Sequence, residues 1–452
     1  MRREDKGKST VDIRTSINIR PMSPYQWLII AVITYLNALD GYDLVATAFA
    51  APHLAEEFAI GSSLLGWVLS AALLGVGVGA AIFGPAGDRW GRRNVILVAL
   101  LIDTVGLLLS GFAGSTAAFI VWRFVTGVGV GGVLACVTVL VSEYANDRFR
   151  GLAMAIYASG YGVGATLCGA LASKAVDTHG WQWIFFAGAA LSAVALALAT
   201  ALLPESVDVL ASRGDATSVE RTARRIGHGG AVLPTQTSAP TSAAGALRTI
   251  VSKVWLPTTV RIWIAFSLIS FGFAFANSWT PKLLNELGLS AQQGIFGGIM
   301  IAFGGTIGSL IFGLITTRVD ARVLLIAFAI GGAGALVAFI FSAGASLVAF
   351  PLGVLVGMLL NACVTGMYTV TPASYPTHLR ATDVGVALAV GRVGPVCGPL
   401  LIGYLAEAGL GPRGLYVVAA SVFVLSAVAL VGLRAPAAKP VVVKEPVEVL
   451  SA

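Results

Sequence analysis

Long apolar runs, each about 20 residues in length and separated by short polar stretches, fill most of this 452-residue chain. An apolar run of about that length spans a bilayer as an α-helix. The pattern therefore predicts an all-α membrane protein of twelve spans. The first six lie near residues 26–51, 64–86, 94–113, 117–142, 151–174 and 181–203, and the second six near 260–284, 292–317, 321–342, 345–373, 382–408 and 413–434.

Polar stretches divide the chain into five parts. Residues 25–203 and 258–434 are expected to form two six-helix bundles, and 204–257, which is rich in Ser, Thr, Gly and Arg, a solvated linker. The tail 1–24 is polar and basic, without the apolar core of a cleavable signal peptide. The tail 435–452 is rich in Pro, Val and Lys and is predicted to be disordered.

Composition agrees with a membrane protein. Hydrophobic residues make up 57% of the chain and charged residues 11%, whereas soluble domains carry about 25% charged residues. The 54 glycines suit close contact between helices in lipid. The four cysteines fall within predicted spans with no CxxC pair, so we expect packing residues rather than disulfides or metal ligands.

The distribution of Lys and Arg predicts the orientation. Of 29 such residues, 24 fall in, or within two residues of, the two tails, the central linker and the loops that follow even-numbered spans. Lys174, Lys282 and Arg413 fall on the opposite side, and Arg123 and Arg392 lie within spans. By the positive-inside rule both termini are cytoplasmic. The net positive charge is thus a topology signal, which predicts a lipid bilayer as partner and no nucleic acid.

The two halves resemble each other at an offset of about 230 residues. Ala135-Cys136-Val137-Thr138 recurs as Ala362-Cys363-Val364-Thr365, the segment 83–93 aligns with 312–322, and Tyr144–Arg150 aligns with Tyr375–Arg380. Two related six-helix bundles around a shared midplane site are typical of transporters, in which one half rocks against the other.

Asp40 and Asp43 lie inside the first apolar run. A carboxylate deep in a bilayer costs at least ~2.5 kcal/mol, and residues three apart share one helix face and are expected to share one environment. Two close carboxylates do not both ionise easily where the dielectric constant is low. The pair predicts a reversible proton site, with a purely structural pair as the alternative. Whether one or both carry the proton stays open.

Other charges within spans suggest roles for three more residues. Arg392, flanked by Gly391, Gly394 and Pro395, presents a planar fork that matches a carboxylate, so it is either a substrate clamp or a partner of the acid pair. The flanking residues predict a locally irregular helix. Asp103 is expected to be a structural acid satisfied by Ser or Thr.

Arg123 and Glu143 lie twenty residues apart on the fourth span, about 30 Å along a helix, so they are not expected to pair. We predict that Glu143 joins the basic cluster Arg89, Arg92 and Arg93 as a gate. Arg123 is either substrate-facing or structural.

The loop after the second span reads Gly84-Pro85-Ala86-Gly87-Asp88-Arg89-Trp90-Gly91-Arg92-Arg93. It resembles the GxxxDRxGRR signature of the major facilitator superfamily. The resemblance implies a gating latch: Gly84 and Gly91 allow a tight turn, Asp88 accepts from a helix N-terminus, and the arginines pair with acids across the interface of the halves. In the second copy Thr317 replaces the acid.

Within that superfamily the chain is similar to the aromatic acid/proton symporters. The block Asp40-Gly41-Tyr42-Asp43, the stretch from Arg123 to Glu143 and the segments 375–382 and 391–395 carry the similarity, while Asp383 departs from the usual Gly. In that fold, spans one, seven and ten line the cavity. Aromatic and amide groups there are expected to suit a planar ring, with ordinary helix packing as the alternative: Tyr42, Asn277, Trp279, Asn361 and Tyr368.

These features predict a monomeric carrier in the cytoplasmic (inner) membrane that imports an aromatic carboxylate with protons and uses no other cofactor. Benzoate, hydroxybenzoates, protocatechuate, gentisate and phenylpropionates are the expected substrate types. The rivals are a carrier of another organic acid or a sugar, a drug/proton antiporter, and a transporter-like receptor. The sequence supports no enzyme, because no nucleophile–base set, metal cluster or phosphate loop is found in it.

Overall fold

The computed structural model describes residues 12–227, 251–316, 318–375, 386–387 and 389–433. Within them, twelve helices are long and apolar enough to cross a membrane, as predicted. Thr317, the segment 376–383 and the tail 435–452 lie outside the described residues. The N-terminal bundle contains α2 (Pro24–Glu57), α3 (Ser62–Trp90), α4 (Arg92–Gly111), α5 (Thr116–Tyr144), α6 (Arg150–His179) and α7 (Gln182–Leu202). The C-terminal bundle contains α11 (Leu256–Glu286), α12 (Ala291–Ile315), α13 (Ala321–Phe341), α14 (Ser346–Ala373), α16 (Val393–Glu407) and α17 (Pro412–Val431).

Local sequence sets where several helices begin. Ser23 and Gln26 form a capping box at the start of α2, and Ser290 and Gln293 form another at the start of α12. In each box the serine side chain accepts from a backbone amide while the glutamine accepts from the cap residue. These caps satisfy amides that a helix start leaves without a partner.

The two bundles use the same kind of close helix contact. A Cβ atom added at Gly79 of α3 would overlap the backbone carbonyl of Val128 on α5, and one added at Gly308 of α12 would overlap that of Met358 on α14. Glycine lets these backbones touch, which is how helices pack tightly in lipid. The second and fourth helices of each bundle thus pack alike, in agreement with the internal repeat.

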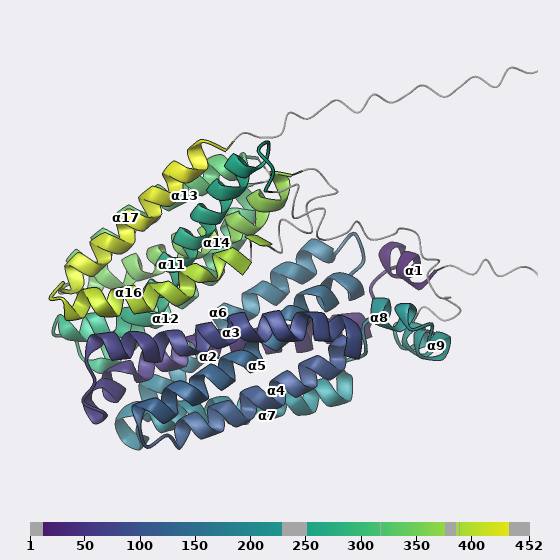
Figure 1. The fold of residues 1–452 in the computed structure, drawn as a ribbon, viewed down its shortest axis with the longest axis horizontal. Coiled ribbons are helices and arrows are strands. Elements are labelled where there is room, and N and C mark those ends of the chain that lie inside the picture. Colours follow the sequence, from purple (N-terminus) through teal and green to yellow (C-terminus); the bar gives the residue numbers. More distant parts are fainter. Residues whose placement is uncertain (1–11, 228–250, 317, 376–385, 388, 434–452) are drawn as a thin grey trace, which may run out of the picture.

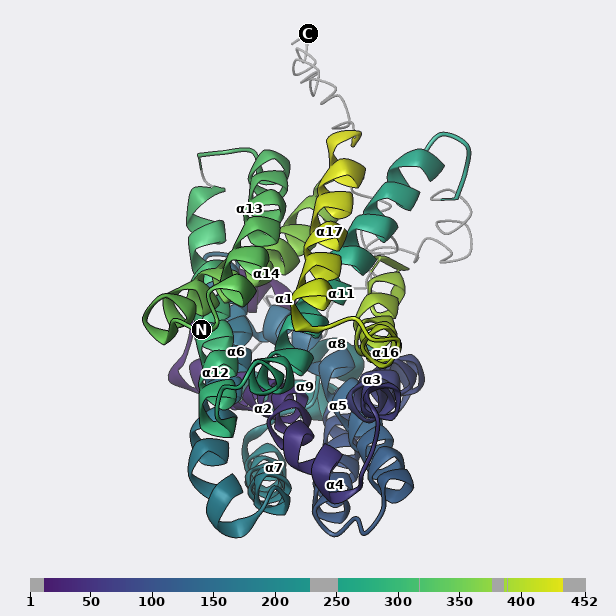
Figure 2. The same ribbon diagram turned by 90° about the vertical axis from the view of Figure 1, so that its left-hand side faces the viewer.

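The bundles meet at one end of the molecule and diverge toward the other (Figure 1). We call the end that carries Arg89, Arg92 and Arg93 the basic end, and the end where α2 gives way to α3 the far end. Across the interface α3 packs on α16 and α6 on α12, as the view from the far end shows (Figure 2).

Four hydrogen bonds join the bundles in the described part of the chain. Glu407 Oε2 accepts from the backbone amide of Ser63 (3.0 Å), and Trp67 Nε1 donates to Tyr404 Oη (3.3 Å). Ser70 Oγ donates to a carbonyl of α16, and a lysine of α11 donates to Ser62 Oγ. All four use the half of α3 nearer the far end, so the far end is closed.

Three short helices at the basic end were not predicted: α1 (Ile13–Ile19), α8 (Val207–Ser212) and α9 (Ala216–Arg225). Their apolar side chains are buried with the N-terminal bundle in one cluster, which includes Ile13, Ile17, Val207 and Val219. The prediction that 204–257 is a solvated linker is therefore wrong for its first part. Apolar burial stabilises these helices on the N-terminal bundle.

Candidate functional site

Asp43 and Arg123 form an ion pair inside the N-terminal bundle. Arg123 Nη1 donates to Asp43 Oδ1 at 2.6 Å and Nη2 to Oδ2 at 3.0 Å, and Nη2 also reaches the Asp43 carbonyl at 3.1 Å. Arg123 is fully buried and Asp43 is 5% exposed. A bidentate arrangement of this kind is the strong form of a charge-assisted hydrogen bond. Arg123 thus faces an aspartate of α2 in this state, which is the structural alternative for this residue.

Asp40 has a different environment, although we expected both aspartates to share one. It is half-buried, and no hydrogen bond or ion pair engages its carboxylate within the described residues. It interacts electrostatically with Arg392 of the other bundle and with Asp43. A helix advances about 100° per residue, so two residues three apart point about 60° away from each other. Asp40 and Asp43 can therefore have different neighbours although they lie on one side of α2.

The helix is interrupted at Arg392, as the neighbouring glycines and proline predicted. Arg392 lies in a turn, and α16 begins at the next residue. Its side chain is half-buried and has no ion pair within 4 Å in the described chain. The backbone dihedrals of Arg392 nevertheless stay helical (φ −71°, ψ −15°), and the membrane span Ala389–Glu407 runs through it. The guanidinium of Arg392 therefore favours an anion at this point of the interface.

Three tyrosines that the sequence did not single out as a group surround this point. Tyr157 and Tyr161 of α6 both interact electrostatically with Asp40, and Tyr157 and Tyr368 with Arg392. The hydroxyl of Tyr161 is buried and has no hydrogen-bond partner among the described residues. Of these, only Tyr368 was predicted, and it is 52% exposed. Their ring faces and hydroxyls can contact both a planar ring and its polar substituents.

Four residues predicted to contact substrate are instead engaged in helix packing. Tyr42 is buried and donates to the Ile184 carbonyl, and Trp279 is buried completely. Asn277 donates to a carbonyl of its own helix, and Asn361 donates to the Gly305 carbonyl. The structure thus favours the packing alternative for these four in the state described.

The basic end holds a second polar cluster. Arg92 forms an ion pair with Glu143, and it also contacts Asp88 Oδ1 at 3.2 Å. Ser206 Oγ donates to Glu143 Oε2 at 2.7 Å. Glu143 is buried, so Arg92 and Ser206 supply the partners that a buried carboxylate requires. Glu143 therefore lies with the basic cluster, as the sequence predicted, and away from Arg123.

Glu205 takes the place at the start of α4 that we expected for Asp88. Its Oε1 accepts from the backbone amide of Arg93 at 3.1 Å, while Asp88 is exposed and, among the described residues, pairs with Arg92. Arg93 donates through Nε to the Leu203 carbonyl at 2.8 Å. An acid at a helix N-terminus is stabilised by the helix dipole.

The turn itself rests on one glycine. Gly91 has φ +100°, which glycine adopts without strain, and it alone separates α3 from α4. Gly84 lies inside α3, so its predicted place in the turn is wrong. Arg89 is exposed, and its carbonyl accepts from Arg213. The expected pairing of the arginines across the interface is also not found: within the described residues their partners belong to the N-terminal bundle and the segment after it.

The four cysteines are free thiols in the described chain. Cys136, Cys168 and Cys363 are buried free thiols and Cys397 is an exposed one. No group of three His, Cys, Asp or Glu side chains among the described residues has the geometry to hold a metal ion.

Residues 32–393 match the family model described as Major Facilitator Superfamily. A gallate transporter of Pseudomonas putida is 31% identical over 405 residues, which cover 89% of this chain and 90% of that protein. A 4-hydroxybenzoate transporter of the same organism is 30% identical and covers 87% of this chain and 88% of its own. The xylose transporter of E. coli, in a partially occluded inward-open conformation, superposes with a TM-score of 0.72 over 90% of this chain and 97% of its own. Its 18% identity makes that a likeness of fold.

Proposed function

Because the chain belongs to the major facilitator superfamily, we propose that it imports an aromatic carboxylate together with protons across the cytoplasmic membrane. The relatives that match most of its length are transporters of gallate and 4-hydroxybenzoate, both of which are carboxylates on an aromatic ring. The observation that carries the proposal is the electrostatic interaction of Asp40 in the N-terminal bundle with Arg392 in the C-terminal bundle.

That arrangement supports an exchange of partners. With the far end open, Asp40 takes a proton, and Arg392 is then free to bind the substrate carboxylate. The bundles rock about the midplane, the far end closes and the basic end opens. Asp40 then loses its proton, competes for Arg392 and displaces the substrate. The positive charge at the basic end supports its placement in the cytoplasm.

The energetics are sufficient for accumulation. Each pH unit across the membrane supplies about 1.4 kcal/mol per proton, a tenfold concentration ratio. One proton with a monoanion moves no net charge, so the membrane potential adds nothing at that stoichiometry. A second proton adds about 2.3 kcal/mol per 100 mV.

The test is uptake of labelled aromatic acids by proteoliposomes. The panel contains gallate, 4-hydroxybenzoate, benzoate and 3-phenylpropionate, with xylose as the control for a sugar carrier. We expect accumulation of at least one aromatic acid, abolished by a protonophore, and none of xylose. No aromatic-acid uptake, or uptake that survives collapse of the proton gradient, contradicts the proposal.

The Asp40→Asn variant tests the coupling role more cleanly than Asp43→Asn. Loss of the Asp43 charge leaves the buried Arg123 without its carboxylate, whereas Asp40 has no ion pair to break among the described residues. We expect Asp40→Asn to retain exchange of labelled for unlabelled substrate and to lose accumulation. Accumulation equal to that of the wild type would remove Asp40 from the coupling role.

A further inference from the structure

Asp103 is a buried acid that the exchange between Asp40 and Arg392 does not use. It lies midway along α4 and is 3% exposed. Its Oδ2 accepts from the Ser192 hydroxyl at 2.6 Å, which agrees with the expected satisfaction by Ser or Thr. Its Oδ1 is buried and has no hydrogen-bond partner among the described residues. A buried polar atom without a hydrogen-bond partner is energetically unfavourable, so this oxygen calls for an explanation.

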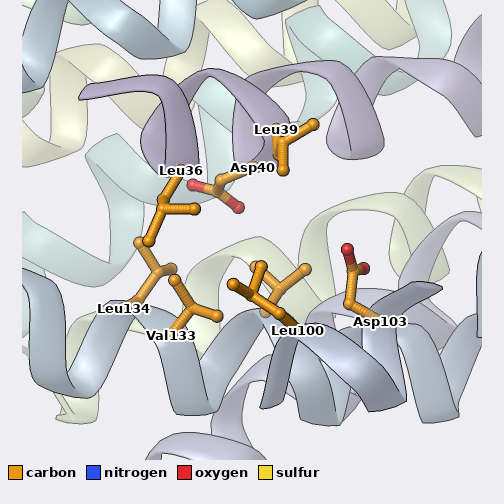
Figure 3. Close-up of a pocket in the computed structure, with 8 residues that line it drawn as sticks. Leu36, Leu39, Asp40, Leu100, Asp103, Val133 and Leu134 are labelled. Carbon is orange, nitrogen blue, oxygen red and sulfur yellow. The ribbon is translucent and has the colours of Figure 1, made fainter. Parts of the chain in front are cut away.

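The unpartnered oxygen belongs to a residue that lines a small void shared with Asp40. The two carboxyl groups face the void from different sides, Asp40 from α2 and Asp103 from α4 (Figure 3). The other lining residues are apolar: Leu36, Leu39, Leu100, Val130, Val133 and Leu134. The void measures about 10 Å³, room for about one water molecule and far too little for an aromatic acid. Two carboxyl groups that face an otherwise apolar void of this size suit a single water molecule that bridges them.

The surroundings of Asp103 allow it to exist in both protonation states. Burial disfavours its charged form most, and Asp43 and Asp40 of α2 repel that form, while the Ser192 hydroxyl and Arg123 of α5 stabilise it. The helix α7, which supplies Ser192, carries no titratable side chain. No cation lies within ion-pair distance of Asp103 in the described chain, so neither form is locked in place.

We propose that Asp103 carries a second proton in each transport cycle and exchanges it with Asp40 through one water molecule in the void. This rests on the proposed function. With the basic end open, Asp40 releases its proton first. The Asp103 carboxyl then gives a proton to the water as the water gives one to the Asp40 carboxylate, so the O–H bond lost at Asp103 is regained at Asp40. Asp40 releases that proton in turn, and two protons accompany one monoanion.

The stoichiometry makes the proposal measurable as a dependence on voltage. Two protons with one monoanion move one positive charge inward, so a potential of 100 mV, negative inside, raises the accumulation ratio about fifty-fold. The experiment clamps the potential of proteoliposomes with potassium and valinomycin and measures uptake of the aromatic acid that the wild type accumulates. We expect the wild type to respond to the potential and Asp103→Asn to accumulate substrate only in response to the pH gradient.

Two outcomes overturn the proposal: a wild type that ignores the potential, or Asp103→Asn that responds to it like the wild type. The voltage response of the wild type is measured without any variant, so the two-proton stoichiometry can be tested even if Asp103→Asn folds poorly. A merely structural Asp103 would lower exchange and accumulation in parallel and leave the voltage response of the remaining uptake intact, which also overturns it. A wild type without protonophore-sensitive accumulation would instead contradict the proposed function itself.

Ser192→Ala gives an independent readout, because it keeps Asp103 and removes its hydroxyl donor. A hydrogen bond to a charged group stabilises the charged form, so its loss moves the pH profile of voltage-driven uptake about one pH unit or more toward alkaline values. The matched control is Ser110→Ala, since the Ser110 hydroxyl is also buried but bonds to its own helix. An unchanged profile in Ser192→Ala contradicts the role of Asp103.

Discussion

Arg123 illustrates how one side chain can depend on another in an apolar bundle. Its guanidinium contacts both carboxylate oxygens of Asp43, and its centre lies 5.5 Å from the ring centroid of Phe185. Desolvation of both charges is costly, and the ion pair offsets that cost only while both partners are present. The pair is therefore a sensitive point for stability.

We expect Arg123→Met to lower the free energy of unfolding by about 3–5 kcal/mol, because it leaves the Asp43 carboxylate buried without a cation. Asp43→Leu combined with Arg123→Met removes both charges and should recover most of that loss. Thermal unfolding in detergent measures both. A single variant as stable as the wild type, or a double variant no better than the single one, contradicts this account of the pair.

Substitution of Arg392, in contrast to that of Arg123, should weaken substrate binding and leave stability nearly unchanged. It has no ion pair in the described chain, so Arg392→Lys should leave the unfolding midpoint nearly unchanged. Because lysine lacks the planar fork that binds a carboxylate through two hydrogen bonds, we expect the KM for the aromatic acid to rise about tenfold or more. Arg413→Lys, at an exposed site of the far end, is the control. Equal KM values for wild type and Arg392→Lys would exclude the clamp.

Sequence chemistry predicted the important charges better than it predicted their partners. Asp40, Asp43 and Arg392 could be recognised because a charge inside an apolar run is costly. The partner of Asp43 could not be recognised from the sequence, because Arg123 lies 80 positions away and the direction in which its side chain leaves α5 depends on helix packing. Tyr157 and Tyr161 carried no signal of their own, since a tyrosine in a span is as ordinary in a helix contact as in a cavity.

At the scale of elements, the turn between α3 and α4 depends on a single residue. A Cβ atom at Gly91 would meet the Glu205 carboxylate, and φ +100° is strained for other residues. A Cβ atom at Gly84 would meet nothing within 4 Å. The two glycines of one motif therefore have unequal roles.

We expect Gly91→Ala to destabilise the protein by about 1–3 kcal/mol and to reduce transport. Gly84→Ala should be neutral or stabilising by about 0.4–1 kcal/mol, because alanine favours a helix. Unfolding midpoints and uptake rates of the two variants provide the comparison. If both variants behave alike, the turn does not depend on the backbone conformation of Gly91.

The helices that cross the membrane could be predicted because bilayer thickness fixes their length. The short helices α1, α8 and α9 could not, because six to ten residues in a polar stretch give too little apolar periodicity. Their caps were a usable signal in retrospect. Asp12, Ser206 and Asp215 each precede one of these helices, and each side chain accepts from a backbone amide of the first turn.

At the scale of the whole molecule, closure of the far end depends on close contact between α3 and α16. A Cβ atom at Gly403 would lie 2.6 Å from the Ser62 carbonyl oxygen and 3.2 Å from the Gly66 Cα atom. Only a glycine fits there while the bundles are in contact. The fold itself followed from the sequence, but the state did not, because one sequence must support both the open and the closed far end.

We expect Gly403→Trp to hold the far end open, so that substrate binding survives and transport falls at least tenfold. The indole ring needs space that exists only when α3 and α16 separate. Gly411→Trp is the matched control, because a side chain at Gly411 meets nothing within 4 Å. Substrate binding is measured by calorimetry and transport by uptake into vesicles. A Gly403→Trp variant that transports normally would show that the close contact between α3 and α16 is not required.

The closed far end also bears on how the carrier responds to its own product. Four hydrogen bonds between the bundles, among the described residues, hold this structure with the site turned toward the basic end. Under the proposed function, with that end in the cytoplasm, an aromatic acid that has already entered the cell would compete for Arg392 and delay the return of the carrier. Uptake would then slow as the internal pool grows, and net import would depend on how quickly catabolism removes each molecule.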